Sequence, residues 1–77
     1  MLKVWHFKFK GRKYAKVYSD SNKIDELLRW AAPYGFGREV VHFSRKRKLP
    51  HIDLSKSSFL AQGLPVVSRR EMLEDIL

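Results

Sequence analysis

The chain has 77 residues and an apolar fraction of 44%, which is enough for one small folded domain spanning residues 1–77. It contains no cysteine, which excludes disulfides, thiolate zinc sites and cysteine nucleophiles, and it has no apolar run of the ~20 residues that a membrane span needs. Sixteen lysines and arginines against eight acids give a net charge of +8, and such a surface attracts polyanions, nucleic acid above all.

The first residues lack the apolar segment of a signal peptide, so we expect an intracellular, cytoplasmic protein without a membrane partner. Part of the positive charge also serves purposes besides binding. It keeps a small protein soluble, and a single Asn and a single Gln beside abundant Lys and Arg are typical of thermophilic proteins.

Two alternating segments begin the chain. Residues 1–9 place apolar and aromatic side chains on both faces of an extended segment, and residues 13–18 alternate in the same way. Between them lies a turn over residues 10–12 that contains Gly11. This pattern predicts a β-hairpin.

A helix is predicted over residues 22–32. The cluster at 20–22 (Asp, Ser, Asn) supplies N-cap oxygens, and one apolar stripe follows at the i, i+3, i+4 and i+7 positions of Ile24, Leu27, Leu28 and Ala31. Pro33 ends the helix and Gly35 supplies a left-handed exit.

The remaining elements are short. We expect a buried strand over 39–43, an irregular Leu49–Pro50 segment, a helix capped by Asp53 or Ser55 that ends before Gly63, and an apolar strand over 64–67. Ser68 and Glu71 have the spacing of a capping box. They predict a last helix whose buried stripe consists of Met72, Leu73, Ile76 and Leu77.

The predicted order is therefore ββαβαβα in a single α/β domain. The strands at 39–43 and 64–67 are separated by a helix, which allows a right-handed parallel crossover. With the antiparallel hairpin this gives a four-stranded mixed sheet packed with helices.

Several spaced blocks extend over most of the chain from Gly11 onward: Gly11 with Asp20, Glu26-Leu27 with Ala31, Gly35-Phe36, His51-Ile52-Asp53 and Gly63 through Glu71. Their order and spacing resemble a small family of bacteria and phages, the domain of unknown function 4031. That family has no assigned activity, so the resemblance implies a fold and no chemistry. Where the family carries histidines, this chain has Lys16 and Leu28.

The leading functional hypothesis is a non-enzymatic domain that binds the phosphate backbone of nucleic acid with little sequence specificity. Aromatic residues alternate with cations along the hairpin, as on sheets where bases stack and lysines hold the backbone, although the same aromatics are also candidates for the core. The predicted contacts are Lys8, Lys10, Arg12, Lys13 and Lys16 in the hairpin and the loop residues Arg45, Lys46, Arg47 and Lys48.

The sequence leaves three other possibilities. Ser68, Arg69 and Arg70 begin the last helix and are candidates for holding an anion. His51 and Asp53 point the same way on an extended segment and are candidates for a metal-dependent hydrolase or a nucleotide-handling protein, with His6 and His42 as possible further ligands. Exposed aromatics would also suit a homodimer. No cofactor and no metal is predicted.

Overall fold

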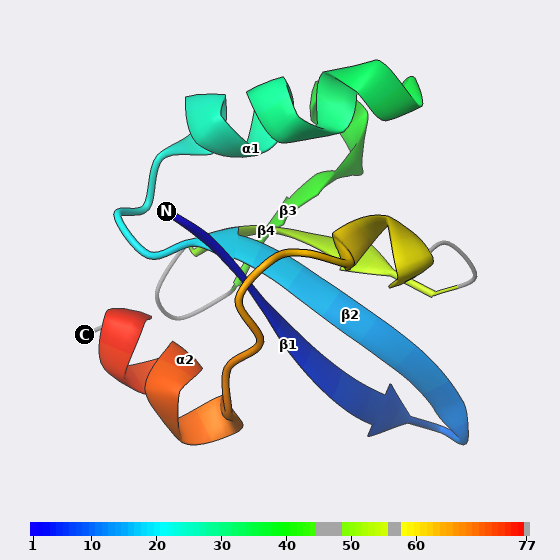
Figure 1. Cartoon of the computed structure of the whole chain (residues 1–77), viewed down its shortest axis with the longest axis vertical. Helices are drawn as coiled ribbons and strands as arrows, with labels where there is room; N and C mark the ends of the chain where they lie inside the picture. The colour runs from blue at the N-terminus through cyan, green and yellow to red at the C-terminus, as the bar shows by residue number, and fades with distance from the viewer. Residues whose placement is uncertain (45–48, 56–57, 77) are drawn as a thin grey trace.

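The computed structural model describes residues 1–44, 49–55 and 58–76 (Figure 1). Four strands form one antiparallel sheet in the order β1-β2-β4-β3. Their bounds are β1 Leu2–Phe9, β2 Arg12–Ser19, β3 Val41–Phe43 and β4 Pro50–Leu54. The helices are α1 Ile24–Ala31 and α2 Arg69–Ile76, with 3₁₀ turns η1 Ala32–Tyr34, η2 Arg38–Val40 and η3 Ser58–Ala61. The prediction of one small α/β domain with a four-stranded sheet is confirmed.

The N-terminal hairpin is confirmed, with Arg12 in the second strand and not in the turn. β1 and β2 pair without interruption from Leu2 opposite Ser19 to Phe9 opposite Arg12. Lys10 and Gly11 alone form the turn, with φ of 51° and 78°. Positive φ at both central residues is the mark of a type I′ turn, whose twist matches that of the two strands.

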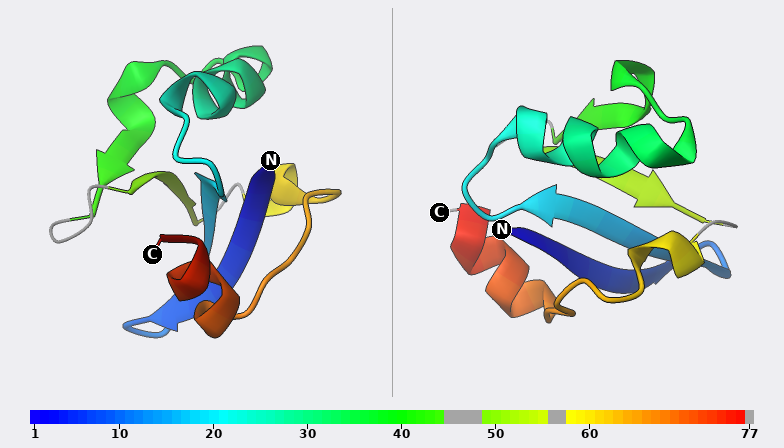
Figure 2. Two further views of the ribbon diagram at one scale, coloured as in Figure 1. Left: turned by 90° about the vertical axis from the view of Figure 1, so that its left-hand side faces the viewer. Right: turned by 45° about the horizontal axis from the view of Figure 1, so that its top comes forward.

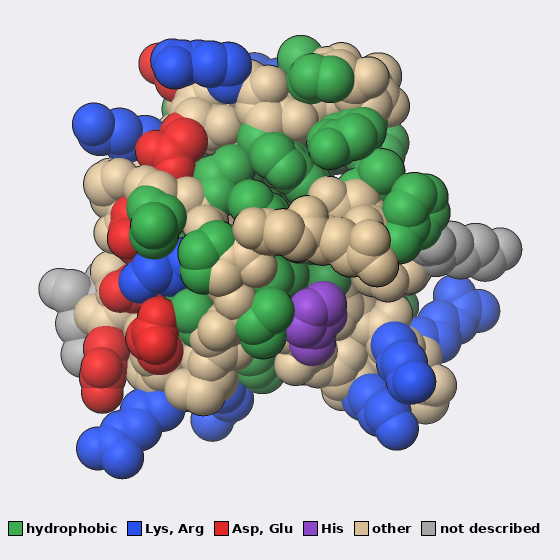
Figure 3. Space-filling view, viewed as in Figure 1, with side chains coloured by type: hydrophobic (Ala, Val, Ile, Leu, Met, Phe, Trp, Pro, Cys, Tyr) green, Lys and Arg blue, Asp and Glu red, His purple; other side chains and the backbone are tan. Residues whose placement is uncertain are grey.

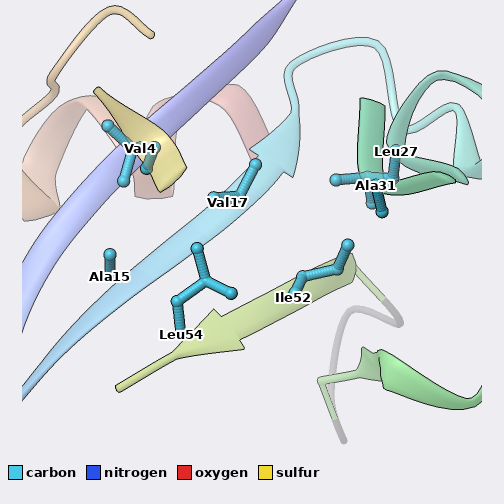
Figure 4. Close-up of a cluster of buried hydrophobic side chains, with 8 residues drawn as sticks. Val4, Ala15, Val17, Leu27, Ala31, Ile52 and Leu54 are labelled. Carbon is cyan, nitrogen blue, oxygen red and sulfur yellow. The ribbon is translucent and has the colours of Figure 1, made fainter. Parts of the chain in front are cut away.

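One face of the sheet carries the main core. Val4, Val17, Ile52 and Leu54 alternate onto this face and meet Leu27 and Ala31 of α1 and Ala61 of η3 (Figure 4). All of these side chains are nearly or fully buried. We call this side the α1 face.

The opposite face is covered at one end by α2, as the further views in Figure 2 show. Tyr18, Leu49, Val67 and Met72 form a second buried cluster there, and Trp5 packs against it. The Ser68 hydroxyl accepts a hydrogen bond from the Glu71 backbone N–H at 3.1 Å, so the predicted cap of the last helix is confirmed.

The segment around His51 differs from the prediction. Residues 50–54 form the central strand β4 instead of a loop and a helix cap, and the helix expected before Gly63 is reduced to η3. Ile52 and Leu54 decide this, because as a strand their alternation places both side chains in the core. Pro50 is tolerated because it is the first residue of the strand.

The parallel crossover is also wrong. Residues 64–67 do not form a strand of the sheet; they meet β1 through one parallel bridge between Val4 and Val66. The Val4 N–H donates to the Pro65 carbonyl, and the Val67 N–H donates to the Val4 carbonyl, both at 2.9 Å. Val66 itself is 68% exposed. Only one residue of β1 is bridged in this way, so the sheet is antiparallel and not mixed.

The other differences are local. Val41 to Phe43 is a half-exposed edge strand, not a buried one. The expected cap cluster at 20–22 is a turn, and α1 begins after Lys23, whose N–H donates to the Ser19 hydroxyl at 3.2 Å. Gly35 adopts the expected left-handed conformation, with φ of 82°, but it ends η1 and not α1.

Candidate nucleic-acid interface

Three aromatic rings are stacked on one another in a row on the face opposite α1. Trp5 and Phe7 follow one another along β1, and Tyr14 stands opposite Phe7 on β2. The ring centroids of Trp5 and Phe7 are 4.6 Å apart with an interplanar angle of 17°, and those of Phe7 and Tyr14 are 5.4 Å apart at 16°. We call these three residues the aromatic platform. Each ring is partly exposed, so the platform is open to a ligand.

Lys16 supplies a positive charge on the platform. It pairs across the strands with Trp5 on one side and with Asp53 on the other. Its ammonium group lies 5.7 Å from the Trp5 ring centroid and 5.5 Å from that of Phe7, within cation–π range. The cation is thus held over the rings, where a phosphate next to a stacked base would find it.

Not every aromatic side chain of the hairpin belongs to this surface. Tyr18 is fully buried beneath α2 and is a core residue, whereas Phe9 is 57% exposed near the turn. Trp5 stands at the border, partly exposed and packed against the second cluster. Tyr18 is therefore a core residue, Phe7 and Tyr14 belong to the platform, and Trp5 belongs to both.

His51 and Asp53 lie next to the platform on β4. The His51 ring is buried, and its Nδ1 is 2.9 Å from the Leu49 carbonyl, to which it donates. Its Nε2 is 3.4 Å from Asp53 Oδ2, which confirms that the two side chains point the same way. Burial alone would raise the pKa of Asp53, but the hydrogen bond and positive charge of His51, aided by Lys16, hold that pKa below its usual value. Asp53 is a strand residue and not a helix cap.

A three-histidine site is excluded by the faces of the sheet. His42 stands opposite His51 on β3, with ring centroids 6.1 Å apart. His6 lies two residues after the buried Val4 on β1, and therefore on the α1 face. Among residues 1–44, 49–55 and 58–76, no group of three or more potential metal ligands comes together. The hydrolase alternative stays with the pair His51 and Asp53.

The five cations predicted in the hairpin divide between the two faces. Arg12 and Lys16 alternate with Tyr14 and share the platform face. Lys8 and Lys13 stand directly opposite one another and belong to the α1 face, while Lys10 is in the turn. Arg45 through Lys48, the densest basic run, lie outside the described residues. The sequence pattern did not predict this division. Because β1 has apolar residues on both faces, the pattern could not show which face packs against α1.

The acidic side chains gather at one end of the molecule. Figure 3 shows them on the left, with Lys and Arg side chains among them, whereas at the lower right, where Figure 1 places the hairpin turn, Lys and Arg stand without visible acids. Lys3 and the N-terminal amine pair with acids at the acidic end, namely Asp20, Glu26, Glu71 and Asp75. No described acid is within ion-pair distance of Lys8, Lys10, Arg12 or Lys13. The hairpin end is therefore a basic surface.

The residues of the candidate anion site at the start of α2 already make contacts within the protein. The Ser68 hydroxyl already accepts a backbone hydrogen bond, and Arg70 Nε lies 3.5 Å from Glu74 Oε1. Glu71 adds a negative charge in the first turn. Anion binding by Ser68, Arg69 and Arg70 stays a prediction.

Compared with models of protein families, with curated proteins and with solved structures, the chain finds no match in any of the three. The family resemblance seen in the spaced blocks therefore stays a prediction. In the part of the chain that the structure describes, no helix is long and apolar enough to cross a membrane.

Proposed function

We propose that this protein binds single-stranded nucleic acid without sequence preference, on the face of the sheet opposite α1. Bases stack against the exposed parts of the row formed by Trp5, Phe7 and Tyr14, and the phosphates are held by Lys16 and by Arg12 and Lys10 toward the turn. The observation that carries the proposal is the platform itself, three near-parallel rings with Lys16 over two of them.

Stacking accounts for a preference for single strands. In a duplex the faces of the bases are already paired with their neighbours, whereas an unpaired strand offers them to protein rings. Each base stacked on an aromatic side chain contributes about 1–3 kcal/mol, and every base has such a face, so the contact is tolerant of sequence. The basic hairpin end adds attraction that is equally independent of sequence.

The first test is a fluorescence anisotropy titration with labelled single- and double-stranded DNA and RNA at two salt concentrations. A binder that neutralises about four to six phosphates shows log K falling with log salt at a slope of about −3 to −4 on a single strand. We expect tighter binding of single strands than of duplexes. No binding at low salt would overturn the proposal.

The second test separates stacking from charge. Phe7→Leu keeps an apolar side chain but removes the central ring, and it should weaken single-strand binding about fivefold or more. Phe59→Leu is the matched control, because Phe59 on η3 is 63% exposed and lies outside the platform. Equal affinities of the two variants would contradict the role of the platform, and circular dichroism confirms that both are folded.

A further inference from the structure

The α1 face of the hairpin contains a hollow that the platform does not use. Its volume is about 490 Å³, within the range of small-molecule sites. Strands β1 and β2 supply most of its lining, and the beginning of η3 supplies the rest; the residues are His6, Phe7, Lys8, Lys13, Tyr14 and Ser58.

Lys8 and Lys13 face one another directly across the two strands of this hollow. Like charges at directly opposite positions destabilise a sheet. No described acid is close enough to form an ion pair with either lysine. The repulsion between Lys8 and Lys13 therefore destabilises the fold locally. An anion bound between the two ammonium groups would replace this repulsion with attraction.

The polar side chains on the α1 face of the hollow can all donate hydrogen bonds. Two are ammonium groups, and the imidazole of His6 and the hydroxyl of Ser58 complete the set. None is a carboxylate. Phe7 and Tyr14 are also among the lining residues, but by alternation their rings lie on the opposite, platform face and so are not part of the hollow. This composition suits a compact, doubly charged anion.

We propose that the hollow binds the phosphate of a phosphomonoester, with Lys8 and Lys13 on either side of it. The site goes beyond the proposed stacking function, since it lies on the other face of the sheet and uses different cations. Two sources share this chemistry, a free mononucleotide and the terminal phosphate of a nucleic-acid strand.

The test is a calorimetric titration of the full chain with AMP, adenosine and inorganic phosphate. We expect AMP to bind at least tenfold more tightly than adenosine, and phosphate to compete with it. The double variant Lys8→Ala with Lys13→Ala should lose at least tenfold in AMP affinity. The matched control, Lys23→Ala with Arg29→Ala, removes the same charge from α1 and its cap and should change it less than twofold.

Two outcomes would overturn the proposal: equal affinity for AMP and adenosine, or an equal loss in the Lys23/Arg29 control. Lys16→Ala separates the two sites, because it should weaken single-strand binding while AMP binding stays within twofold. If Lys16→Ala weakens AMP binding as much as the Lys8/Lys13 variant does, the hollow is not a separate site. Short strands with and without a 5′-phosphate then distinguish the sources. If the hollow binds strand ends, the 5′-phosphorylated strand should bind more tightly than the unphosphorylated strand and more tightly than AMP.

Discussion

The Tyr18 hydroxyl donates a 2.6 Å hydrogen bond to Asp75 Oδ2, joining the centre of the sheet to the C-terminal helix. The same carboxylate oxygen lies 2.9 Å from Lys3 Nζ, so it receives two donors from adjacent strands. Lys3 and Tyr18 are cross-strand partners, which aims both donors at one point. α2 is short, and of its described apolar side chains Met72 is buried whereas Leu73 is 38% exposed. This polar contact therefore helps to fix where the helix lies on the sheet.

Tyr18→Phe should therefore destabilise the domain. It leaves the ring in place but removes the hydroxyl that donates to a charged acceptor, a bond of about 1.5–3 kcal/mol. Urea denaturation followed by circular dichroism measures the loss. Glu74→Gln is the control, since its pair with Arg70 is exposed and contributes little. A Tyr18→Phe variant as stable as the parent chain would show that the contact does not hold α2.

Stability should fall in acid. The hydrogen bond from Tyr18 and the Lys3 pair lower the pKa of Asp75, and the N-terminal amine lowers that of Asp20. A carboxyl whose pKa is lower in the folded state stabilises the fold above its unfolded value of 3.8 and loses this contribution as the pH falls below it. We expect the free energy of unfolding to be constant between about pH 5 and pH 8, the unfolded pKa of the N-terminal amine, and to drop below about pH 4.

The check is a series of urea melts from strongly acidic to neutral pH. Asp75→Asn should be less stable than the parent at neutral pH and should show a shallower decline in acid. Parallel curves for the two proteins would mean that Asp75 does not contribute to the acid transition.

Stability should also fall in strong base. Burial raises the pKa of Tyr18, and the hydrogen bond to Asp75 raises it further; the pKa of Lys3 is raised mainly by its hydrogen bond to Asp75. Groups with a raised pKa contribute stability below their unfolded values, 10.0 and 10.5, and lose it as the pH rises above them. The ultraviolet absorbance of tyrosinate, followed with pH, should show Tyr18 titrating together with unfolding. A separate, earlier titration of all three tyrosines would contradict this.

Ile52→Ala tests the central strand that the sequence pattern did not predict. Ile52 is 1% exposed and stands between Val17 of β2 and Val41 of β3. Its truncation should cost about 2–5 kcal/mol, a large part of the stability of so small a domain. Val66→Ala, in the exposed segment whose apolar run predicts a strand, should cost less than about 0.5 kcal/mol. Similar losses at the two positions would argue against this arrangement of the sheet.

The elements that the sequence predicted correctly are those with a local cause. Lys10-Gly11 determines the hairpin turn, and the apolar stripe of α1 and the Ser68 cap of α2 lie within a few residues of what they control. β4 was missed because Asp53 and Ser55 are good helix caps, while the alternation of Ile52 and Leu54 counts only once a neighbouring strand exists. There, pairing with distant strands outweighed the local preference of these residues for a helix cap.

The candidate site was predicted in its composition but not in its geometry. The aromatic and basic residues of the hairpin were identified, yet β1 is apolar on both faces. Only the positions of α1 and α2 decide that Tyr18 is buried and Phe7 is partly open, and that Lys8 and Lys16 belong to different faces. Such assignments depend on contacts between residues far apart in the chain.

Asp53→Asn should strengthen the binding of single-stranded nucleic acid. Asp53 stands opposite Lys16 beside the platform, and its lowered pKa keeps it charged at neutral pH, so it repels a strand lying there. At ~8 Å in water one unit charge contributes about 0.5 kcal/mol, or roughly a twofold gain in affinity when it is removed. Anisotropy at low salt measures the gain, and Asp25→Asn on α1 is the control with the same change of net charge. If Asp53→Asn instead weakens binding, or if Asp25→Asn gains as much, the strand does not run beside Lys16.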